Sequence, residues 1–249
     1  MSERNAKFEC KHDELVIRGK IYGDTASPKP VVILSHGFLA NQKMCGKYAG
    51  LLANIGYVAV TFDFCGGGLG CKSDGKSEDM TILSEVRDLF SVIDHVKKQS
   101  YAKSVSLLGC SQGGFVSAMA AKKLPDQIEK LILMYPALCI PDDARKGKMM
   151  FYRFEPQNIP DTLGWFPMKL GGNYAKTVTD MDTFEEIGGF DGPVLYLHGT
   201  ADKIVDIEYA RKAKDLYSNC EYHEIVGGGH MFRGKSDKEA CRLLADFMK

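Results

Sequence analysis

The sequence lacks an excess of charge of either sign and lacks long apolar runs. Its 32 lysine and arginine residues equal its 32 aspartate and glutamate residues, so it has no basic field that would concentrate nucleic acid. No run approaches the ~18 consecutive apolar residues of a membrane-spanning helix, and residues 1–7 contain no stretch of signal-peptide length. We therefore expect no nucleic-acid partner, no membrane partner and a cytoplasmic location.

Signs of a metal site or of a disulfide framework are also missing. The eight cysteines are dispersed, with no CxxC pair, in a chain large enough to fold without covalent staples. With 45% apolar and 26% charged residues, the composition is that of an ordinary globular protein. We predict reduced thiols, no metal and no cofactor.

Short apolar runs alternate with helical patterns along the chain. Residues 7–23 are typical of a hairpin, and continuous apolar runs typical of strands buried on both faces follow. These runs are 31–34, 57–62, 105–108, 131–134 and 194–197. Helical spacing between them predicts an α/β fold, a mostly parallel sheet with helices on both faces, in a single domain over residues 1–249. Ser236 and Glu239 have the spacing of a capping box for a last helix.

One connection is far longer than a crossover helix requires. Between the strand ending near Tyr135 and the one starting at Pro193, residues 140–180 are rich in Met, Phe, Tyr, Pro and Gly and contain the only tryptophan, Trp165. We interpret residues 140–180 as a cap inserted over the carboxyl edge of the sheet, where open α/β sheets bind ligands. Trp165 and Phe166 are the hypothesised wall of a substrate pocket. The apolar side chains of the cap could instead form the contact of a homodimer.

A nucleophile motif follows the strand 105–108 directly. The sequence Gly109-Cys110-Ser111-Gln112-Gly113 matches G-x-S-x-G at a strand-to-helix turn, where small flanking residues let a strained backbone lift the serine hydroxyl above the sheet. Ser111 is the predicted nucleophile. The competing interpretation is a glycine-rich loop whose serine only caps the following helix.

A serine hydroxyl needs a base, and the base needs an orienting carboxylate. Asp202 follows the strand 194–197, and His230 follows a later strand, so the chain order is Ser, Asp, His and all three lie at one edge of the sheet. Asp206 is the alternative acid, although it could cap the next helix. His36 precedes the nucleophile, and we expect it to brace its loop by hydrogen bonds.

The tetrahedral intermediate also needs backbone N–H donors for its oxyanion. One comes from the residue after the nucleophile, which is Gln112, and the other from the loop after an earlier central strand, which places it at Phe38. These two amides are the predicted oxyanion hole.

Together these motifs resemble an α/β-hydrolase of the serine esterase type, and more narrowly the small bacterial feruloyl (cinnamoyl) esterases. The resemblance rests on segments spread over nearly the whole chain: 35–38, 63–64 with 66–70, 109–113, 158–161, 198–202 and 229–230. It implies catalytic roles for Ser111, Asp202 and His230. It also implies hydrolysis of small-molecule hydroxycinnamate or similar aromatic esters through an acyl-enzyme. Asp143 matches an acidic residue that meets the phenolic hydroxyl, whereas the position of its amide partner holds Met150.

Three alternatives stay open. The same machinery could serve as a general carboxylesterase, an acylglycerol or lysophospholipid hydrolase, or an acyl peptidase. Residues 66–70 could be the phosphate loop of a nucleotide-binding protein, although Cys71 stands where a third glycine is needed. The third alternative is a non-catalytic binding protein of this fold, which would require a broken triad.

Overall fold

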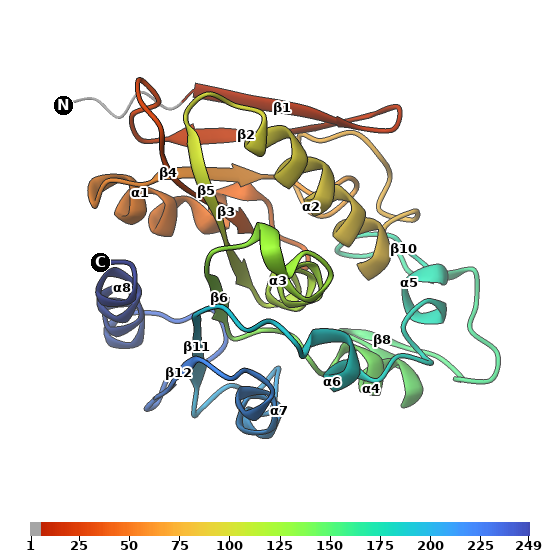
Figure 1. The fold of residues 1–249 in the computed structure, drawn as a ribbon. Helices are drawn as coiled ribbons and strands as arrows, with labels where there is room; N and C mark the ends of the chain where they lie inside the picture. Colours follow the sequence, from red (N-terminus) through yellow and green to blue (C-terminus); the bar gives the residue numbers. More distant parts are fainter. Residues whose placement is uncertain (1–5) are drawn as a thin grey trace.

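The computed structural model describes residues 6–249. Residues 1–5, on which the prediction about a signal peptide partly rests, lie outside the described residues. Within the described chain the main sheet has eight strands in the order β1-β2-β4-β3-β5-β6-β11-β12 (Figure 1). Their bounds are β1 Ala6–His12, β2 Leu15–Tyr22, β3 Lys29–Ser35, β4 Val58–Phe62, β5 Ala102–Cys110, β6 Leu131–Met134, β11 Val194–Gly199 and β12 Cys220–Ile225.

The sheet is parallel except at one edge. The hairpin β1–β2 pairs antiparallel, β2 joins β4 antiparallel, and all pairs from β4 to β12 are parallel. The parallel strands β4, β6 and β11 are covered on both faces, which explains why their residues are all buried and mostly apolar, whereas the edge strand β12 is only partly buried.

Helices cover both faces of the sheet. The helices α1 and α8 pack on one face and α2, α3 and α7 on the other (Figure 1), so that alternate residues of β3, β4, β5, β6 and β11 enter two separate cores. Their bounds are α1 Gly46–Asn54, α2 Ile82–Lys97, α3 Gln112–Lys123, α7 Ile207–Ala213 and α8 Lys235–Phe247, and short 3₁₀ turns span Gln42–Cys45, Pro125–Gln127 and Lys214–Leu216. The predicted α/β-hydrolase architecture is confirmed.

The connection between β6 and β11 is built from short pieces. They are α4 Ile140–Arg145, β7 Lys148–Met149, β8 Tyr152–Arg153, β9 Thr162–Gly164, β10 Leu170–Gly171, α5 Asn173–Lys176 and α6 Thr183–Ile187. Two small hairpins, β7–β8 and β9–β10, supply its internal backbone pairing. Strands this short are specified by their surroundings rather than by sequence periodicity. The sequence therefore predicts the inserted segment but not the short helices and strands within it.

The capping box predicted at the last helix is wrong. Helix α8 begins two residues earlier, after Gly234, and the Ser236 hydroxyl accepts from the Arg233 N–H instead of forming a reciprocal pair with Glu239. A positive φ of 59° at Gly234 makes the sharp entry that a capping serine would otherwise provide. Among residues 6–249, no helix combines the length and the apolar composition that crossing a bilayer would require.

Candidate active site

The turn that carries Ser111 has a strained backbone. Ser111 lies between the last residue of β5 and the first of α3, with φ 55° and ψ −120°, a region that side-chain-bearing residues rarely adopt. A Cβ atom at Gly109 would lie 2.2 Å from the Gly113 carbonyl oxygen, so only glycine fits there. Strain of this kind persists only where the surrounding structure holds it, and it is typical of a nucleophile elbow.

Three predicted residues form one hydrogen-bonded chain. His230 Nε2 lies 2.8 Å from Ser111 Oγ, and His230 Nδ1 lies 2.7 Å from Asp202 Oδ2. Because a carboxylate only accepts, the network assigns the proton to Nδ1 and leaves Nε2 free to accept from the serine hydroxyl. Loops that follow β5, β11 and β12 bring these residues together from positions far apart in the sequence.

The carboxylate of Asp202 is fully buried and still favours its charged form. Its Oδ1 atom accepts from the N–H groups of Ile204, at 2.8 Å, and Val205, at 3.1 Å. Burial acts to raise the pKa of Asp202, but the hydrogen bonds from His230 and Val205 outweigh it, and the pKa is lowered. Asp206, the alternative acid, accepts from the Glu208 N–H and caps α7, as expected.

The two predicted oxyanion residues flank the nucleophile. A Cβ atom at Gly37 would lie 3.0 Å from Ser111 Cβ, so the loop that carries Phe38 lies against the serine. Gln112 is the first residue of α3, where backbone N–H groups have no intrahelical acceptor. Both residues line the same cavity as Ser111 and His230.

His36 braces this loop, as predicted. The ring is fully buried, Nε2 accepts from the Phe64 N–H at 3.2 Å, and Nδ1 therefore donates to the Gly37 carbonyl at 2.8 Å. Burial lowers the pKa of His36 and favours the neutral ring that this pair of bonds requires.

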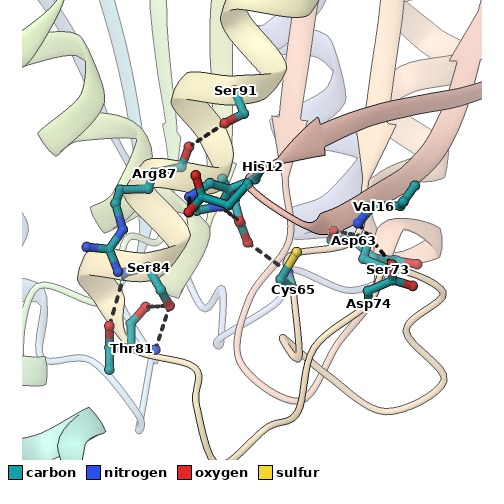
Figure 2. Close-up of polar contacts among 12 residues, drawn as sticks. His12, Val16, Asp63, Cys65, Ser73, Asp74, Thr81, Ser84, Arg87 and Ser91 are labelled. Atoms are coloured by element: carbon teal, nitrogen blue, oxygen red, sulfur yellow. Dashed lines mark hydrogen bonds and ion pairs between the residues drawn. The ribbon is translucent and has the colours of Figure 1, made fainter.

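The loop after β4, residues 63–80, is held by the hairpin edge of the sheet. The Ser73 hydroxyl donates to the Asp63 carbonyl at 2.5 Å, and the Asp74 carboxylate accepts from the Val16 N–H at 3.0 Å (Figure 2). The Asp63 carboxylate in turn accepts from the Gln42 N–H at 2.6 Å. The loop that carries Phe38 is thus anchored through residues 63–80 to β2.

The glycines in that loop do not form a phosphate cradle. Gly66 N–H donates to Asp74 and Gly67 N–H to Phe64, both to backbone carbonyls, and the next helix, α2, starts only at Ile82. A phosphate loop needs free N–H groups at the start of a helix. The arrangement argues against the nucleotide-binding alternative.

A largely apolar cavity of about 290 Å³ opens at Ser111. Asp143 and Met150 both line it, and Lys148 forms an ion pair with Asp143 at 3.4 Å. Its apolar walls come from Phe38, Met44, Ile140, Met149, Phe151, Leu170, Tyr174 and Val205.

The structure does not bring Trp165 and Phe166 into this cavity, which corrects the hypothesis that they form its wall. They occupy the turn between β9 and β10 and are 76% and 86% exposed. The Lys169 ammonium lies 4.9 Å from the centroid of the Trp165 ring, on the surface. The turn of a hairpin lies at the end of its two paired strands, and the composition of the segment does not predict on which side of the cavity that turn lies.

Three residues that sequence reasoning did not select contact the site. The Tyr174 hydroxyl, from α5, donates to the side-chain carbonyl of Gln112, and its ring lies 5.8 Å from that of Phe38. Glu85, from α2, is fully buried, and burial raises its pKa more than the nearby Gln112 amide lowers it. Lys148 is the ion-pair partner of Asp143. No motif identifies such residues, because they act through tertiary contacts.

Comparison with known proteins identifies the family. A model described as serine aminopeptidase, S33 matches residues 26–164, more than half of the chain. The chain belongs to this family. Membership of this family confirms the prediction that the chain is a serine hydrolase.

The proteins that this chain resembles are named for different substrates or ligands. A solved structure of Est1E from Butyrivibrio proteoclasticus with ferulic acid bound matches this serine hydrolase with a TM-score of 0.90 and 29% identity over 97% of both chains. Lysophosphatidylserine lipase ABHD12 of Danio rerio is 25% identical over 90% of this chain and 59% of that protein. Monoglyceride lipase of Rattus norvegicus is 30% identical over 51% of this chain and 41% of that protein. The predicted resemblance to feruloyl esterases is confirmed, while the chain spans about three fifths or less of these two curated relatives.

Proposed function

We propose that the chain hydrolyses carboxylic esters through an acyl-enzyme formed on Ser111. The observation that supports this most directly is the unbroken hydrogen-bond chain from Asp202 through His230 to Ser111, with distances of 2.7 and 2.8 Å. A base within hydrogen-bond reach of a hydroxyl, itself oriented by a carboxylate, is the arrangement that activates a serine.

The roles follow from the geometry. Ser111 Oγ attacks the ester carbonyl while His230 Nε2 takes its proton, and the buried Asp202 carboxylate stabilises the imidazolium that forms. His230 then protonates the departing alcohol oxygen, and water repeats the sequence to release the acid. Backbone N–H groups of Phe38 and Gln112 receive the oxyanion, a contribution of about 10²–10³-fold for each such donor.

For the acyl group we propose a hydroxycinnamate or a similar small aromatic acid. A cavity of about 290 Å³ lies at the small end of ligand pockets, and its walls are mostly apolar. The Asp143–Lys148 pair supplies a carboxylate and an ammonium at this cavity. A phenolic hydroxyl could therefore hydrogen-bond to this pair, although Met150, at the position of the amide partner, offers no hydrogen bond. The likeness to an Est1E structure with ferulic acid bound also supports this choice.

An acylglycerol or lysophospholipid ester is the second candidate. It is favoured by the likeness to monoglyceride lipase and to lysophosphatidylserine lipase ABHD12. A longer acyl chain would gain ~0.8 kcal/mol for each buried CH₂ only if the cavity could lengthen. The two candidates therefore differ in their response to chain length.

The test compares ethyl ferulate with ethyl butyrate and with longer saturated ethyl esters. Wild type, Ser111→Ala and Asp143→Asn are measured, with Asp161→Asn as the matched control, because Asp161 is an exposed carboxylate of the cap segment that does not line the cavity. An aminoacyl 4-nitroanilide tests the peptidase alternative.

We expect a preference for ferulate, loss of hydrolysis in Ser111→Ala, and loss of the ferulate preference in Asp143→Asn alone. Preference that rises with acyl length would favour the second candidate. Full activity of Ser111→Ala would contradict the serine mechanism. The cytoplasmic location and the homodimer stay predictions.

A further inference from the structure

One buried carboxyl group of the protein has no part in the mechanism proposed above. Glu85 lies in the first turn of α2 and is fully buried. A capping box between Thr81 and Ser84 fixes this turn (Figure 2), and the Glu85 N–H donates to the Thr81 carbonyl at 3.0 Å. The backbone that carries the carboxyl group is therefore firmly held.

The Glu85 side chain lies close to Gln112, the first residue of α3. Helix α2 packs against α3, and the Gln112 side-chain amide lowers the pKa of Glu85. Burial has the larger effect and raises that pKa, and the charge of Asp88 one turn further along α2 acts in the same direction. The surroundings of Glu85 therefore favour the uncharged carboxyl group.

Polar atoms on both sides of this contact lack partners. Neither Glu85 carboxyl oxygen forms a hydrogen bond of normal length within residues 6–249, and the same is true of the Gln112 amide nitrogen. The Gln112 amide oxygen accepts from the Tyr174 hydroxyl and has a second lone pair. An uncharged carboxyl group can accept from the amide nitrogen and donate to that lone pair. Because unpaired polar groups are costly in the interior, a small adjustment that pairs the two side chains is favoured.

Such a pair would hold the residue that we propose as one oxyanion donor. Tyr174 binds the amide oxygen of Gln112, and Glu85 would bind the amide nitrogen, so the side chain would be fixed at both polar atoms. The backbone N–H of the same residue must point to where the oxyanion forms, and its contribution depends on that direction.

We propose that Glu85 is a positioning residue that keeps the backbone N–H of Gln112 directed at the oxyanion by pairing with the Gln112 side-chain amide. The proposal rests on the ester hydrolysis proposed above and deepens it. Glu85 does not line the cavity at Ser111, so it acts through Gln112 and not on the substrate.

The test replaces Glu85 by an uncharged polar and by an apolar side chain of similar size. Glu85→Gln keeps a donor and an acceptor, whereas Glu85→Leu removes both. With 4-nitrophenyl butyrate we measure kcat, KM, the affinity for a boronic acid that mimics the tetrahedral intermediate, and the melting temperature. Ser117→Ala is the matched control, because Ser117 is a buried residue of α3 whose hydroxyl has no hydrogen-bond partner among residues 6–249.

We expect Glu85→Leu to lower both kcat and boronic acid affinity about tenfold with KM unchanged, less than for complete loss of an oxyanion donor. Glu85→Gln should keep both values within about twofold of wild type, because it retains the hydrogen-bonding groups. The melting temperature of Glu85→Leu should not fall with kcat, because removal of an unpaired buried carboxyl group offsets the loss of the pair. Ser117→Ala should match wild type in kcat.

Coupling to Gln112 makes the test specific. Gln112→Leu lacks the amide that Glu85 is proposed to hold, so Glu85→Leu should have no further effect on kcat in that background. Where Glu85→Leu does not fold, Glu85→Asp replaces it, because it withdraws the carboxyl group from the amide by one CH₂ and should lower kcat with KM unchanged.

Three outcomes would overturn the proposal: kcat and boronic acid affinity that survive Glu85→Leu or Glu85→Asp, a Glu85→Gln variant as slow as Glu85→Leu, or additive effects of the Glu85 and Gln112 substitutions. Ser111→Ala is assayed in parallel with the same ester. Loss of hydrolysis in Ser111→Ala shows that the serine mechanism stands even where the role of Glu85 fails.

Discussion

The hydrogen bond between Tyr174 and Gln112 links the inserted segment, residues 140–180, to the residue that we propose as one oxyanion donor. Tyr174→Phe removes only the hydroxyl and keeps the ring against Phe38. The side-chain carbonyl of Gln112 then loses this donor in a fully buried position, which costs about 1–3 kcal/mol of unfolding free energy. For a chain of this size the melting temperature should fall by roughly 2–12 °C.

The effect on catalysis is separable from the effect on stability. Complete loss of an oxyanion donor lowers kcat about 10²–10³-fold, whereas here the Gln112 N–H is kept and only its orientation is loosened. We therefore expect kcat to fall about tenfold, equivalent to ~1.4 kcal/mol of barrier, with KM unchanged. Affinity for a boronic acid that mimics the tetrahedral intermediate should fall by the same factor.

The assay measures kcat, KM and boronic acid affinity with 4-nitrophenyl butyrate, beside the melting temperature. Tyr152→Phe is the control, because the Tyr152 hydroxyl donates to the Met168 carbonyl at 2.6 Å within the cap segment and does not contact Gln112. Gln112→Leu keeps the backbone N–H, and in that background Tyr174→Phe should have no further effect on kcat. A lowered melting temperature with unchanged kcat and boronic acid affinity would refute the reasoning.

Three other expectations follow from the site. Asp202 has a folded-state pKa below its unfolded value, so its charged form stabilises the fold above about pH 4, and this stabilisation is lost as the pH falls through the folded-state pKa. Denaturant unfolding between pH 5 and pH 3 should therefore show a smaller loss of stability in Asp202→Asn than in wild type. Gly37→Ala would bring a Cβ to within 3.0 Å of Ser111 Cβ, so labelling by a fluorophosphonate should slow at least tenfold while the circular dichroism spectrum stays the same. Trp165→Ala should leave kcat and KM unchanged for both ferulate and butyrate esters, because the side chain is 76% exposed and does not line the cavity at Ser111; a raised KM for ferulate alone would restore it to the pocket.

Local patterns predicted the parts of the molecule that depend on local physics. The apolar strands and the G-x-S-x-G turn are short-range features, and chain order at one sheet edge was enough to select Asp202 and His230. The Ser111 backbone at φ 55° is what such a turn requires.

The parts that sequence did not predict depend on which segments meet in space. Tyr174 lies 62 positions from Gln112 along the chain, and its four-residue helix has no motif. Trp165 is an aromatic residue of the inserted segment, which is why the sequence predicts it in the pocket wall, but its position in the turn between two paired strands leaves it exposed. The Asp143–Lys148 pair depends on how the chain turns between α4 and β7, which composition does not encode.

The residue that we propose as the catalytic base, His230, follows the edge strand of the parallel part of the sheet. Among the strands of residues 6–249, β12 lies at the sheet edge and pairs only with β11, whereas Ser111 follows the central strand β5. Edge elements open at lower free energy than the centre of a sheet, so the chain can lose its base while most of its secondary structure is intact. Hydrolysis is then the most sensitive report of native structure, and it should disappear at a lower denaturant concentration than helical circular dichroism.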